Sequence, residues 1–415
     1  MEKIKSKIYN IITSIIYFFR QGIYLLSPTN GYFLVGNFDA FYLFAPMYLY
    51  NKFKKIKEKN GNIKDIKISK TTIALLVTCV IYVIIQIIFI PNINILRVMV
   101  NMAKIVVCYL VMKYVKEYYN RFDISFICKA FSILCGVFLI IAITFPNSML
   151  WRHNDIINKY DLNRLQFLYT EPSELGLHAM PIILVYTFMM LNTKNSKKLL
   201  IYMMFTLPII MALLYAKPLG AIGIGAISIV VLCVSDLIIN FSKKKLMIYM
   251  VFVLLGVMLL GGLVITKSSI YLRIIDTFNG KDMSNSYRIT VPFTIATQSI
   301  MDSKGIGIGL GNAELKDNVE KYGYLGLEKE GVINSYMNII AEGGIFGLVL
   351  SAIVIASILK KSVEEKSSIK IALSIFIIIY QFMGTYFTNP LCWIIYGIIL
   401  SDFEFKKKEE EWNFQ

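Results

Sequence analysis

The sequence has few charged residues and almost no histidine. Only 17% of its 415 residues are charged, 56% are hydrophobic, and the mean hydropathy is +0.61. This composition excludes a soluble globular protein, which would expose too much apolar surface, and it indicates an integral membrane protein. The two histidines, His153 and His178, are too few for a typical zinc site, and they form no catalytic set with a serine or a cysteine.

Cysteine gives no sign of disulfide or metal chemistry either. The six cysteines all fall in or beside apolar segments, and none lies in the long polar interval late in the chain. We interpret them as small apolar packing residues. Since no cluster of metal ligands is visible, the sequence predicts that an enzyme built on this chain needs no metal or other cofactor. Such an enzyme would work by positioning and charge stabilisation.

A net charge of +16 raises the question of nucleic-acid binding. The lysines occur in short clusters between apolar segments, as in the cytoplasmic loops that orient a membrane protein. No aromatic residues alternate with them to form a stacking surface for bases. The sequence therefore predicts no nucleic-acid partner, and the lysines predict a membrane topology instead.

Long apolar segments are abundant, and each can cross a hydrocarbon core of about 30 Å as a helix. Uninterrupted apolar runs exclude a transmembrane β-barrel, whose strands alternate in hydrophobicity. The sequence predicts an all-α polytopic membrane protein, a single integral membrane domain over residues 1–415, with about 12 transmembrane helices. The expected spans are 8–26, which either crosses the membrane or lies in its interface, 32–50, 71–90, 96–115, 126–145, 175–191, 199–216, 219–239, 246–266, 336–359, 369–387 and 391–403.

Lysine-rich and lysine-poor gaps alternate along this series of segments. The positive-inside rule therefore predicts a multi-pass protein of the cytoplasmic membrane with both termini in the cytoplasm. Two longer gaps then face outward, a medium external loop at 146–172 and a large external loop at 267–333. We expect the larger loop to contain short helices that lie on the bundle.

Arginines are expected at membrane level on the outer side, where positive charge is disfavoured. They are Arg164, Arg273 and Arg288. A guanidinium offers a planar fork of donors that matches a carboxylate or a phosphate. The residues alone leave two interpretations open, namely salt bridges to Glu171, Glu174 or Asp276, or binding of a lipid-linked phosphate or pyrophosphate at the headgroup plane.

Carboxylates also occur near the outer surface of the membrane, where they are costly and usually functional. Glu171 lies where the medium loop enters a helix, beside Pro172 at its first turn. Glu342 follows Asn334 by a little over two helical turns, so these two residues share roughly one face. We expect Glu342 to be either paired or catalytic.

Glycine alternates with isoleucine or leucine from Gly305 to Gly311, directly before Asn312. This run lacks the Lys-Ser/Thr of a nucleotide-binding P-loop and follows no βαβ pattern. One interpretation is a tight backbone turn packed against the bundle. The alternative is a concavity of backbone donors for a sugar or a phosphate.

Taken together, these segments resemble the O-antigen polymerase and O-antigen ligase superfamily. The resemblance rests on an outer-loop arginine before Glu171-Pro172-Ser173, on Arg288 followed by the glycine run and Asn312, and on Asn334-x-Tyr336 followed by Ala341-Glu342, Gly344 and Gly347. The large external loop late in the chain fits the same superfamily.

The resemblance implies a membrane glycosyltransferase that moves a glycan from undecaprenyl pyrophosphate to another lipid-linked repeat unit on the outer face of the membrane. Its expected partners are the undecaprenyl-pyrophosphate-linked oligosaccharide, membrane lipid and a chain-length regulator protein. The implied catalytic residues are Glu171, Glu342 and Asn334, with either glutamate as the base. The implied substrate-binding residues are Arg164, Arg288, Arg273, Asn312 and Tyr336.

One position separates the branches of this superfamily. Ligases resembling this chain carry a histidine just before Asn334, where this sequence has Ile333. The difference favours a polysaccharide polymerase over an O-antigen ligase. A polysaccharide flippase is the third alternative, although flippases usually consist of two similar halves with short loops. Whether the product is capsule, O-antigen or another polysaccharide stays open.

Overall fold

The computed structural model describes most of the chain from Lys70 to Asp402. The described residues are 70–119, 121–153, 163–169, 171–243, 245–247, 249–250, 271–272, 275–276, 279, 286–313, 315–322, 332–385 and 387–402. Within them the protein is almost entirely helical, which confirms the predicted all-α polytopic membrane fold.

The helices and strands follow the predicted segments closely. They are α4 (Lys70–Phe89), α5 (Ile95–Tyr118), α6 (Arg121–Thr144), β1 (Trp151–His153), β2 (Asn163–Leu165), α7 (Pro172–Asn192), α8 (Ser196–Ala216), α9 (Leu219–Ile239), a π-helical turn (Ser286–Thr290), α13 (Val291–Asp302), α14 (Lys316–Tyr322), α15 (Ser335–Glu364), α16 (Ser368–Tyr380) and α17 (Pro390–Leu400). The expected spans 8–26 and 32–50 lie outside the described residues, as does most of 246–266, so the total number of spans stays a prediction.

Among the described residues, six helices are long and apolar enough to cross a membrane, namely α5 to α9 and α15. Shorter apolar helices occur in α4, α16 and α17. Helix α16 ends at Tyr380, well before the expected boundary at residue 387, and the chain then turns before α17 begins. That turn forms hydrogen bonds with several other segments of the chain.

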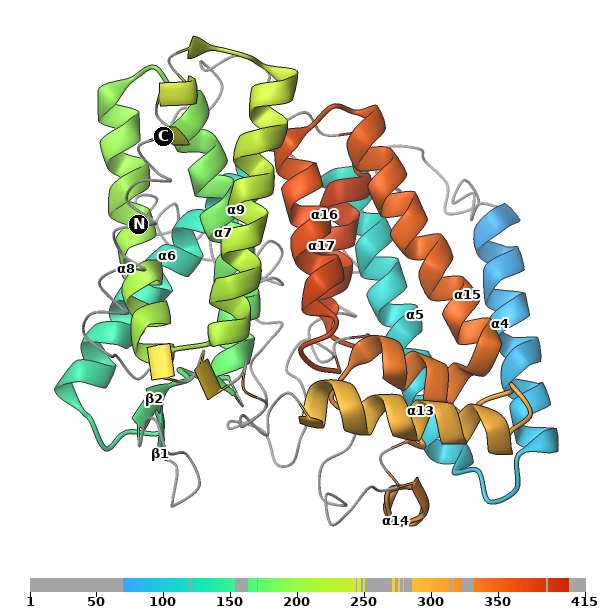
Figure 1. The fold of residues 1–415 in the computed structure, drawn as a ribbon. Coiled ribbons are helices and arrows are strands. Elements are labelled where there is room, and N and C mark those ends of the chain that lie inside the picture. The colour runs from blue at the N-terminus through green and yellow to red at the C-terminus, as the bar shows by residue number, and fades with distance from the viewer. Residues whose placement is uncertain are drawn as a thin grey trace, which may run out of the picture.

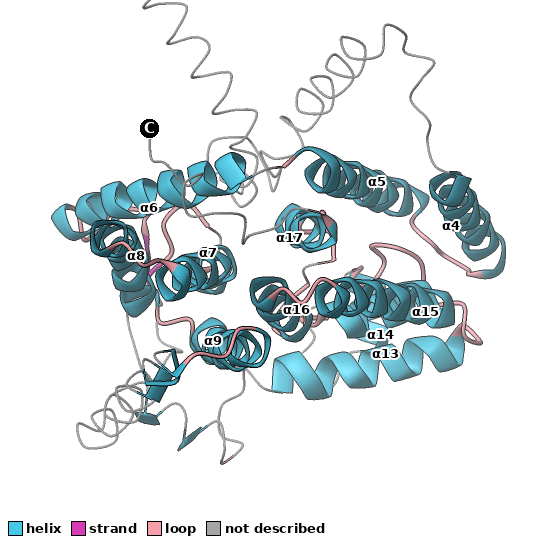
Figure 2. Cartoon of the chain, turned by 90° about the horizontal axis from the view of Figure 1, so that it is seen from above, coloured by secondary structure: helices cyan, strands magenta, loops and turns pink. Residues whose placement is uncertain are grey.

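Two groups of helices lie side by side (Figures 1 and 2). One group contains α6 to α9, and the other contains α4, α5, α15, α16 and α17. Helix α9 packs along α16 where the groups meet, and α5 packs along α17 within the second group. Most of these helices run roughly parallel to a common axis, as expected for a bundle that spans a bilayer, whereas α6 is strongly tilted (Figures 1 and 2).

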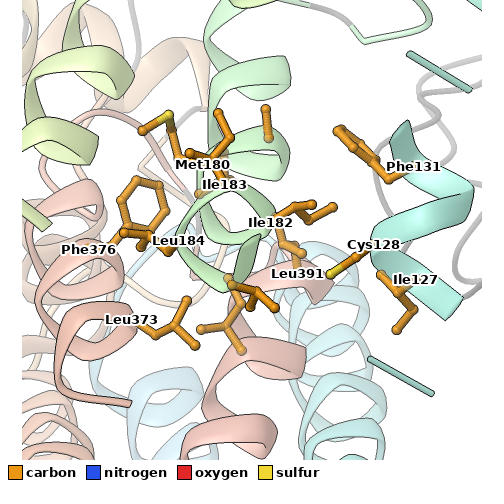
Figure 3. Close-up of a cluster of buried hydrophobic side chains, with 14 of the residues drawn as sticks. Ile127, Cys128, Phe131, Met180, Ile182, Ile183, Leu184, Leu373, Phe376 and Leu391 are labelled. Carbon is orange, nitrogen blue, oxygen red and sulfur yellow. The ribbon is translucent and has the colours of Figure 1, made fainter. Parts of the chain in front are cut away.

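Helix α7 is the most buried of the membrane-spanning helices. Its apolar side chains Met180, Ile182, Ile183 and Leu184 lie among side chains of α6, α16 and α17 (Figure 3). The outer helices instead expose large apolar residues such as Leu96 and Ile140. Apolar faces on the outside of a helical bundle are consistent with contact to lipid.

The two ends of the bundle differ in chemistry. One end, called here the loop end, carries the β1–β2 hairpin, α13, α14 and the starts of α7, α9 and α15 (Figure 1). Helix α13 lies across the foot of α15, as expected for a short helix of the large loop. The opposite end, called here the lysine end, contains the ion pairs Lys245–Asp236, Lys361–Asp402 and Lys370–Glu365. That the loop end faces outward stays a prediction.

Candidate functional site

The glycine run is built into a break in α15. At Gly344 the backbone has φ 55° and ψ −148°, which interrupts the helix. The run enters this break as a short paired segment. The Ile308 N–H donates to the Ala341 carbonyl at 2.9 Å, and the Ile345 N–H donates to the Gly305 carbonyl at 3.0 Å. Irregular backbone at membrane depth is tolerated only where such pairing satisfies its polar groups.

Two side chains of α4 complete this pairing from the other side. The Tyr82 hydroxyl donates to the Ile306 carbonyl at 2.5 Å, and the Gly343 carbonyl lies 2.9 Å from it. The buried Gln86 amide donates to the Glu342 carbonyl at 2.7 Å and to the Ile306 carbonyl at 3.1 Å. Helix α4 therefore satisfies carbonyl oxygens that the break in α15 leaves without helical partners.

Close backbone approach explains the glycines themselves. All four glycines of the run have positive φ, between 73° and 95°. A Cβ at Gly307 would lie 2.5 Å from the Gly344 nitrogen, and a Cβ at Gly344 would lie 2.2 Å from the Gly305 oxygen. The amides of Gly307, Ile308 and Gly309 already donate to Ser303, Ala341 and Glu342. These donors serve the fold, which supports the interpretation of the run as a packed turn.

Glu342 lies inside this packed region and is only 8% exposed. Its Oε1 accepts a hydrogen bond from the Ala313 N–H at 3.2 Å. The Asn338 amide, oriented with its nitrogen toward the carboxylate, donates to both oxygens at 3.1 Å. The carboxylate thus joins α15 to the end of the glycine run, which corresponds to the paired alternative. A role for Glu342 as a base stays a prediction.

Asn312 is fully buried and joins the same run to the turn between α4 and α5. Its Oδ1 accepts the Asn94 N–H at 2.8 Å, and its Nδ2 donates to the Leu310 carbonyl at 3.1 Å. Arg97 donates from Nη1 to the Gly311 carbonyl at 3.1 Å. The structure therefore groups Asn312 with Glu342 around the glycine run.

Asn334 and Arg288 form a second group at the start of α15. The Asn334 Oδ1 accepts the backbone N–H of Tyr336 and of Met337, which caps the helix. Its Nδ2 donates to the Arg288 carbonyl at 2.9 Å, and the Arg288 Nε donates to the Met383 carbonyl at 3.2 Å. Within the described part of the chain, the terminal Nη atoms of Arg288 have no protein partner.

Tyr336 points from α15 toward α16. Its hydroxyl donates to the Ile378 carbonyl at 2.8 Å, and its ring lies 4.7 Å from that of Phe382. The hydroxyl is therefore committed to the fold, although the ring is only partly buried. Contact of Tyr336 with a glycan stays a prediction.

Arg164 lies on β2 and holds the turn between α8 and α9. It donates from Nε to the Ala216 carbonyl at 3.0 Å and from Nη2 to the Lys217 carbonyl at 3.1 Å. In the antiparallel β1–β2 pair Arg164 is directly opposite Arg152. Cross-strand partners point to the same face, so the hairpin presents two guanidinium groups together.

Glu171 occupies the N-cap position of α7, and its side chain is 56% exposed. Arg152 Nη1 lies 3.7 Å from its Oε1, and the Ser173 hydroxyl donates to its Oε2 at 3.0 Å. The structure thus places Glu171 beside the hairpin arginines, at the surface of the loop end. Arg273 lies outside the described residues.

Residues 219–352 match a family model described as O-antigen ligase. Over this stretch, about a third of the chain, the protein is similar to the O-antigen polymerase and ligase superfamily. The match supports a membrane glycan-processing enzyme of the O-antigen ligase and polymerase type. No curated protein matches the chain.

The predicted site residues of both groups, Arg288, Asn312, Asn334 and Glu342, lie within the part matched by the family model. Arg164 and Glu171 precede this part in the sequence, and the turn after α16 follows it. Sequence reasoning missed Arg152, Gln86 and Met383. Gln86 carried a usable signal, because a polar side chain within an apolar span is costly unless it is paired. Met383 acts through its backbone carbonyl, which no sequence pattern marks.

Proposed function

We propose that this protein is a polysaccharide polymerase of the outer face of the cytoplasmic membrane. It transfers a growing glycan from undecaprenyl pyrophosphate to the terminal sugar of another lipid-linked repeat unit. The observation that supports this most directly is Arg288 at the loop end. One nitrogen of its guanidinium is fixed by the Met383 carbonyl, whereas the terminal nitrogens have no partner among the described residues. A fixed fork of free donors suits a diphosphate.

The other cations of the loop end support the same proposal. Arg152 and Arg164 share one face of the hairpin, and Arg164 also holds Lys217 through its carbonyl. The diphosphate of a polyprenyl lipid lies at the headgroup plane, which is the level expected for this end of the bundle. Donors fixed by backbone carbonyls need little reorganisation as negative charge develops on the leaving group.

For the base we propose Glu171 rather than Glu342. Glu171 is largely exposed beside the arginines, whereas Glu342 is buried and hydrogen-bonded to Ala313 and Asn338. In the proposed step Glu171 takes the proton of the acceptor hydroxyl. The acceptor oxygen then bonds to the anomeric carbon, and the bond from that carbon to the diphosphate oxygen breaks. The diphosphate leaves on its lipid, held by Arg288 and Arg164.

The orientation of the protein belongs to the same proposal. The segments that carry the ion-paired lysines, at the ends of α9 and α15, lie at the end of the bundle opposite to the start of α7 and to α13 (Figure 1). The positive-inside rule then directs the lysine end and both termini to the cytoplasm. A chain-length regulator protein is the expected protein partner.

The second candidate is an O-antigen ligase, which the description of the matched family favours. It would use the same donor but a different acceptor. Ile333 replaces the histidine that the resemblance to ligases leads one to expect, and this favours the polymerase.

Two strains test the proposal, one that lacks the protein and one that carries Arg288→Ala. Deletion is expected to leave single repeat units on lipid at the outer surface, and Arg288→Ala is expected to reproduce this state with normal amounts of membrane-inserted protein. Lys316→Ala, in α14 of the same loop, is the matched control and is expected to retain polymer. Repeat units trapped in the cytoplasm would indicate a flippase. Polymer of normal length from Arg288→Ala would refute the role of this arginine.

A further inference from the structure

The turn that follows α16, residues 380–385, is hydrogen-bonded to the first turn of α7 after Glu171, to Arg288 and to the start of α15 after Asn334. It is called here the α16 turn. Its hydrogen bonds run from the Tyr380 hydroxyl to the Ser173 carbonyl (2.7 Å), from the Ser335 N–H to the Gln381 carbonyl (2.9 Å), from Arg288 Nε to the Met383 carbonyl (3.2 Å), from the Ser335 hydroxyl to the Gly384 carbonyl (2.7 Å) and from the Thr385 hydroxyl to the Val332 carbonyl (3.2 Å).

The end of a helix provides the acceptors for these contacts. The last carbonyl groups of a helix have no partner within it. The Ile378 carbonyl, near the end of α16, accepts the Tyr336 hydroxyl, and three carbonyls of the α16 turn accept from Arg288 and Ser335. Buried carbonyl groups need hydrogen-bond donors, and because α16 ends early, these donors come from Arg288 and from the start of α15.

Tyr380 connects this turn to Glu171. Its side chain is buried, and its ring lies 5.2 Å from that of Phe376. The hydroxyl donates to the Ser173 carbonyl, and the Ser173 hydroxyl donates to Glu171 Oε2 at 3.0 Å. A rigid aromatic side chain thus fixes the first turn of α7, on which the proposed base is placed.

We propose that the α16 turn is the positioning element of the glycosyl-transfer site and that Tyr380 is a positioning residue for Glu171; this rests on the proposed function. Glu171 precedes α7 of one helix group, whereas Arg288, on the π-helical turn before α13, is joined through Asn334 to α15 of the other group. The α16 turn is hydrogen-bonded to the segments of both residues. In the proposed reaction Arg288 binds the diphosphate of the donor and Glu171 deprotonates the acceptor, so the distance between these two side chains must stay fixed. A misplacement of about 1 Å can lower the rate by on the order of 100-fold.

This element lies outside the stretch matched to the superfamily, which ends at residue 352. The matched stretch supplies Arg288 and Asn334, whereas Glu171 comes from an earlier helix. The α16 turn therefore joins parts of the site that the matched domain does not hold together by itself. The side chain of Met383 also lies close to Gly220, since a Cβ added at that glycine would be 3.0 Å from the Met383 sulfur. Gly220 follows the turn whose carbonyls Arg164 binds.

Tyr380→Phe tests the inference, since it removes one hydroxyl and keeps the ring. The substrate is a lipid extract of the deletion strain, which contains single lipid-linked repeat units. We expect kcat to fall about tenfold while KM stays within about twofold, because the displaced base affects the reaction more than binding. The matched control is Tyr186→Phe, which removes another buried hydroxyl, 3.2 Å from the Ser132 hydroxyl, and should leave both constants unchanged.

Ser335→Ala is the second variant, and it decides the matter if Tyr380→Phe fails to reach the membrane. It removes the hydrogen bond to the Gly384 carbonyl and should also lower kcat more than it raises KM. Equal kinetics of Tyr380→Phe and Tyr186→Phe, or a loss confined to KM, would overturn the inference. If Arg288→Ala lost activity in that case, the proposed function would stand without this positioning role. Normal polymer from Arg288→Ala would instead refute the role of Arg288, and repeat units trapped in the cytoplasm of the deletion strain would refute the proposed function itself.

Discussion

Two neighbouring glycines of α15 allow a direct test of the break in this helix. Gly344 has a backbone conformation with φ 55° and ψ −148° that is nearly restricted to glycine. A Cβ placed there would lie 2.2 Å from the Gly305 oxygen. Gly343, one residue earlier, has no atom within 4 Å of such a Cβ, and its φ is not positive.

The size of the expected effect follows from two contributions. The strained backbone conformation costs on the order of 1–3 kcal/mol for alanine. The clash also displaces the Gly305 carbonyl, which accepts the Ile345 N–H at 3.0 Å, and an unsatisfied buried group costs roughly 1–3 kcal/mol. Gly344→Ala should therefore destabilise the protein by about 3 kcal/mol or more. Gly343→Ala should be neutral or slightly stabilising, because alanine is favoured over glycine in a helix by roughly 0.5–1 kcal/mol.

Thermal unfolding of the purified protein in detergent measures this difference. At about 1 °C for each kcal/mol in a chain of this length, Gly344→Ala should lower Tm by about 3 °C or more relative to Gly343→Ala. Equal melting temperatures for the two variants would refute the inserted-turn geometry. A loss of stability in Gly343→Ala alone would contradict it as well.

Four further predictions concern single side chains. Glu171→Gln should abolish polymer and leave the melting temperature unchanged, whereas Glu342→Leu should lower stability by roughly 1–3 kcal/mol because the buried Ala313 N–H loses its acceptor; the reverse pattern in activity and melting assays would exchange their roles. Gln86→Leu should destabilise the protein, because the Glu342 and Ile306 carbonyls lose the amide that donates to them. An unchanged melting temperature would argue against this stabilising role of α4. Phe293→Trp should add fluorescence that brominated lipids quench, since this exposed residue lies on α13 at the foot of α15, whereas Asp317→Trp on α14 should add none that they quench. A hydrogen bond from Lys321 lowers the pKa of Asp302. The ion pair therefore stabilises the contact between α13 and α14 above the ordinary aspartate pKa, and this contribution is lost as pH falls through the lowered pKa. Protease cleavage at α14 should then differ between wild type and Asp302→Asn at neutral pH but not in acid.

Much of the fold could be predicted from local sequence. The apolar segments at 71–90, 96–115, 126–145 and 219–239 correspond closely to helices, because a span of continuous apolar residues in lipid has no alternative to the helix for satisfying its backbone. The end of α16 at Tyr380 was not predicted. Its apolar run continues past that point, and only contacts with other segments show why the helix stops there.

The sequence singled out some of the residues that the structure brings together, and their catalytic and binding roles stay predictions. The residue types at Arg164, Glu171 and Arg288 indicated anion and proton chemistry at the outer surface. Arg152 was missed because its importance comes from its cross-strand position opposite Arg164 and from its distance to Glu171. Glu342 and Asn334 were both expected to be catalytic. Their hydrogen bonds give each a place in the fold, which the sequence could not distinguish from a place in the chemistry.

The sequence by itself determined the class of the molecule, since composition and the length of apolar runs leave a helical membrane bundle as the only stable arrangement. It also marked the glycine run, but it could not show that Gly344 requires glycine whereas Gly343 does not. Only the tertiary structure shows which backbone groups pair with one another through hydrogen bonds. The glycine run pairs with a helix break at Gly344, and the α16 turn joins Ser173 to Arg288 and Ser335, because backbone groups far apart in the chain must find hydrogen-bond partners where water is absent.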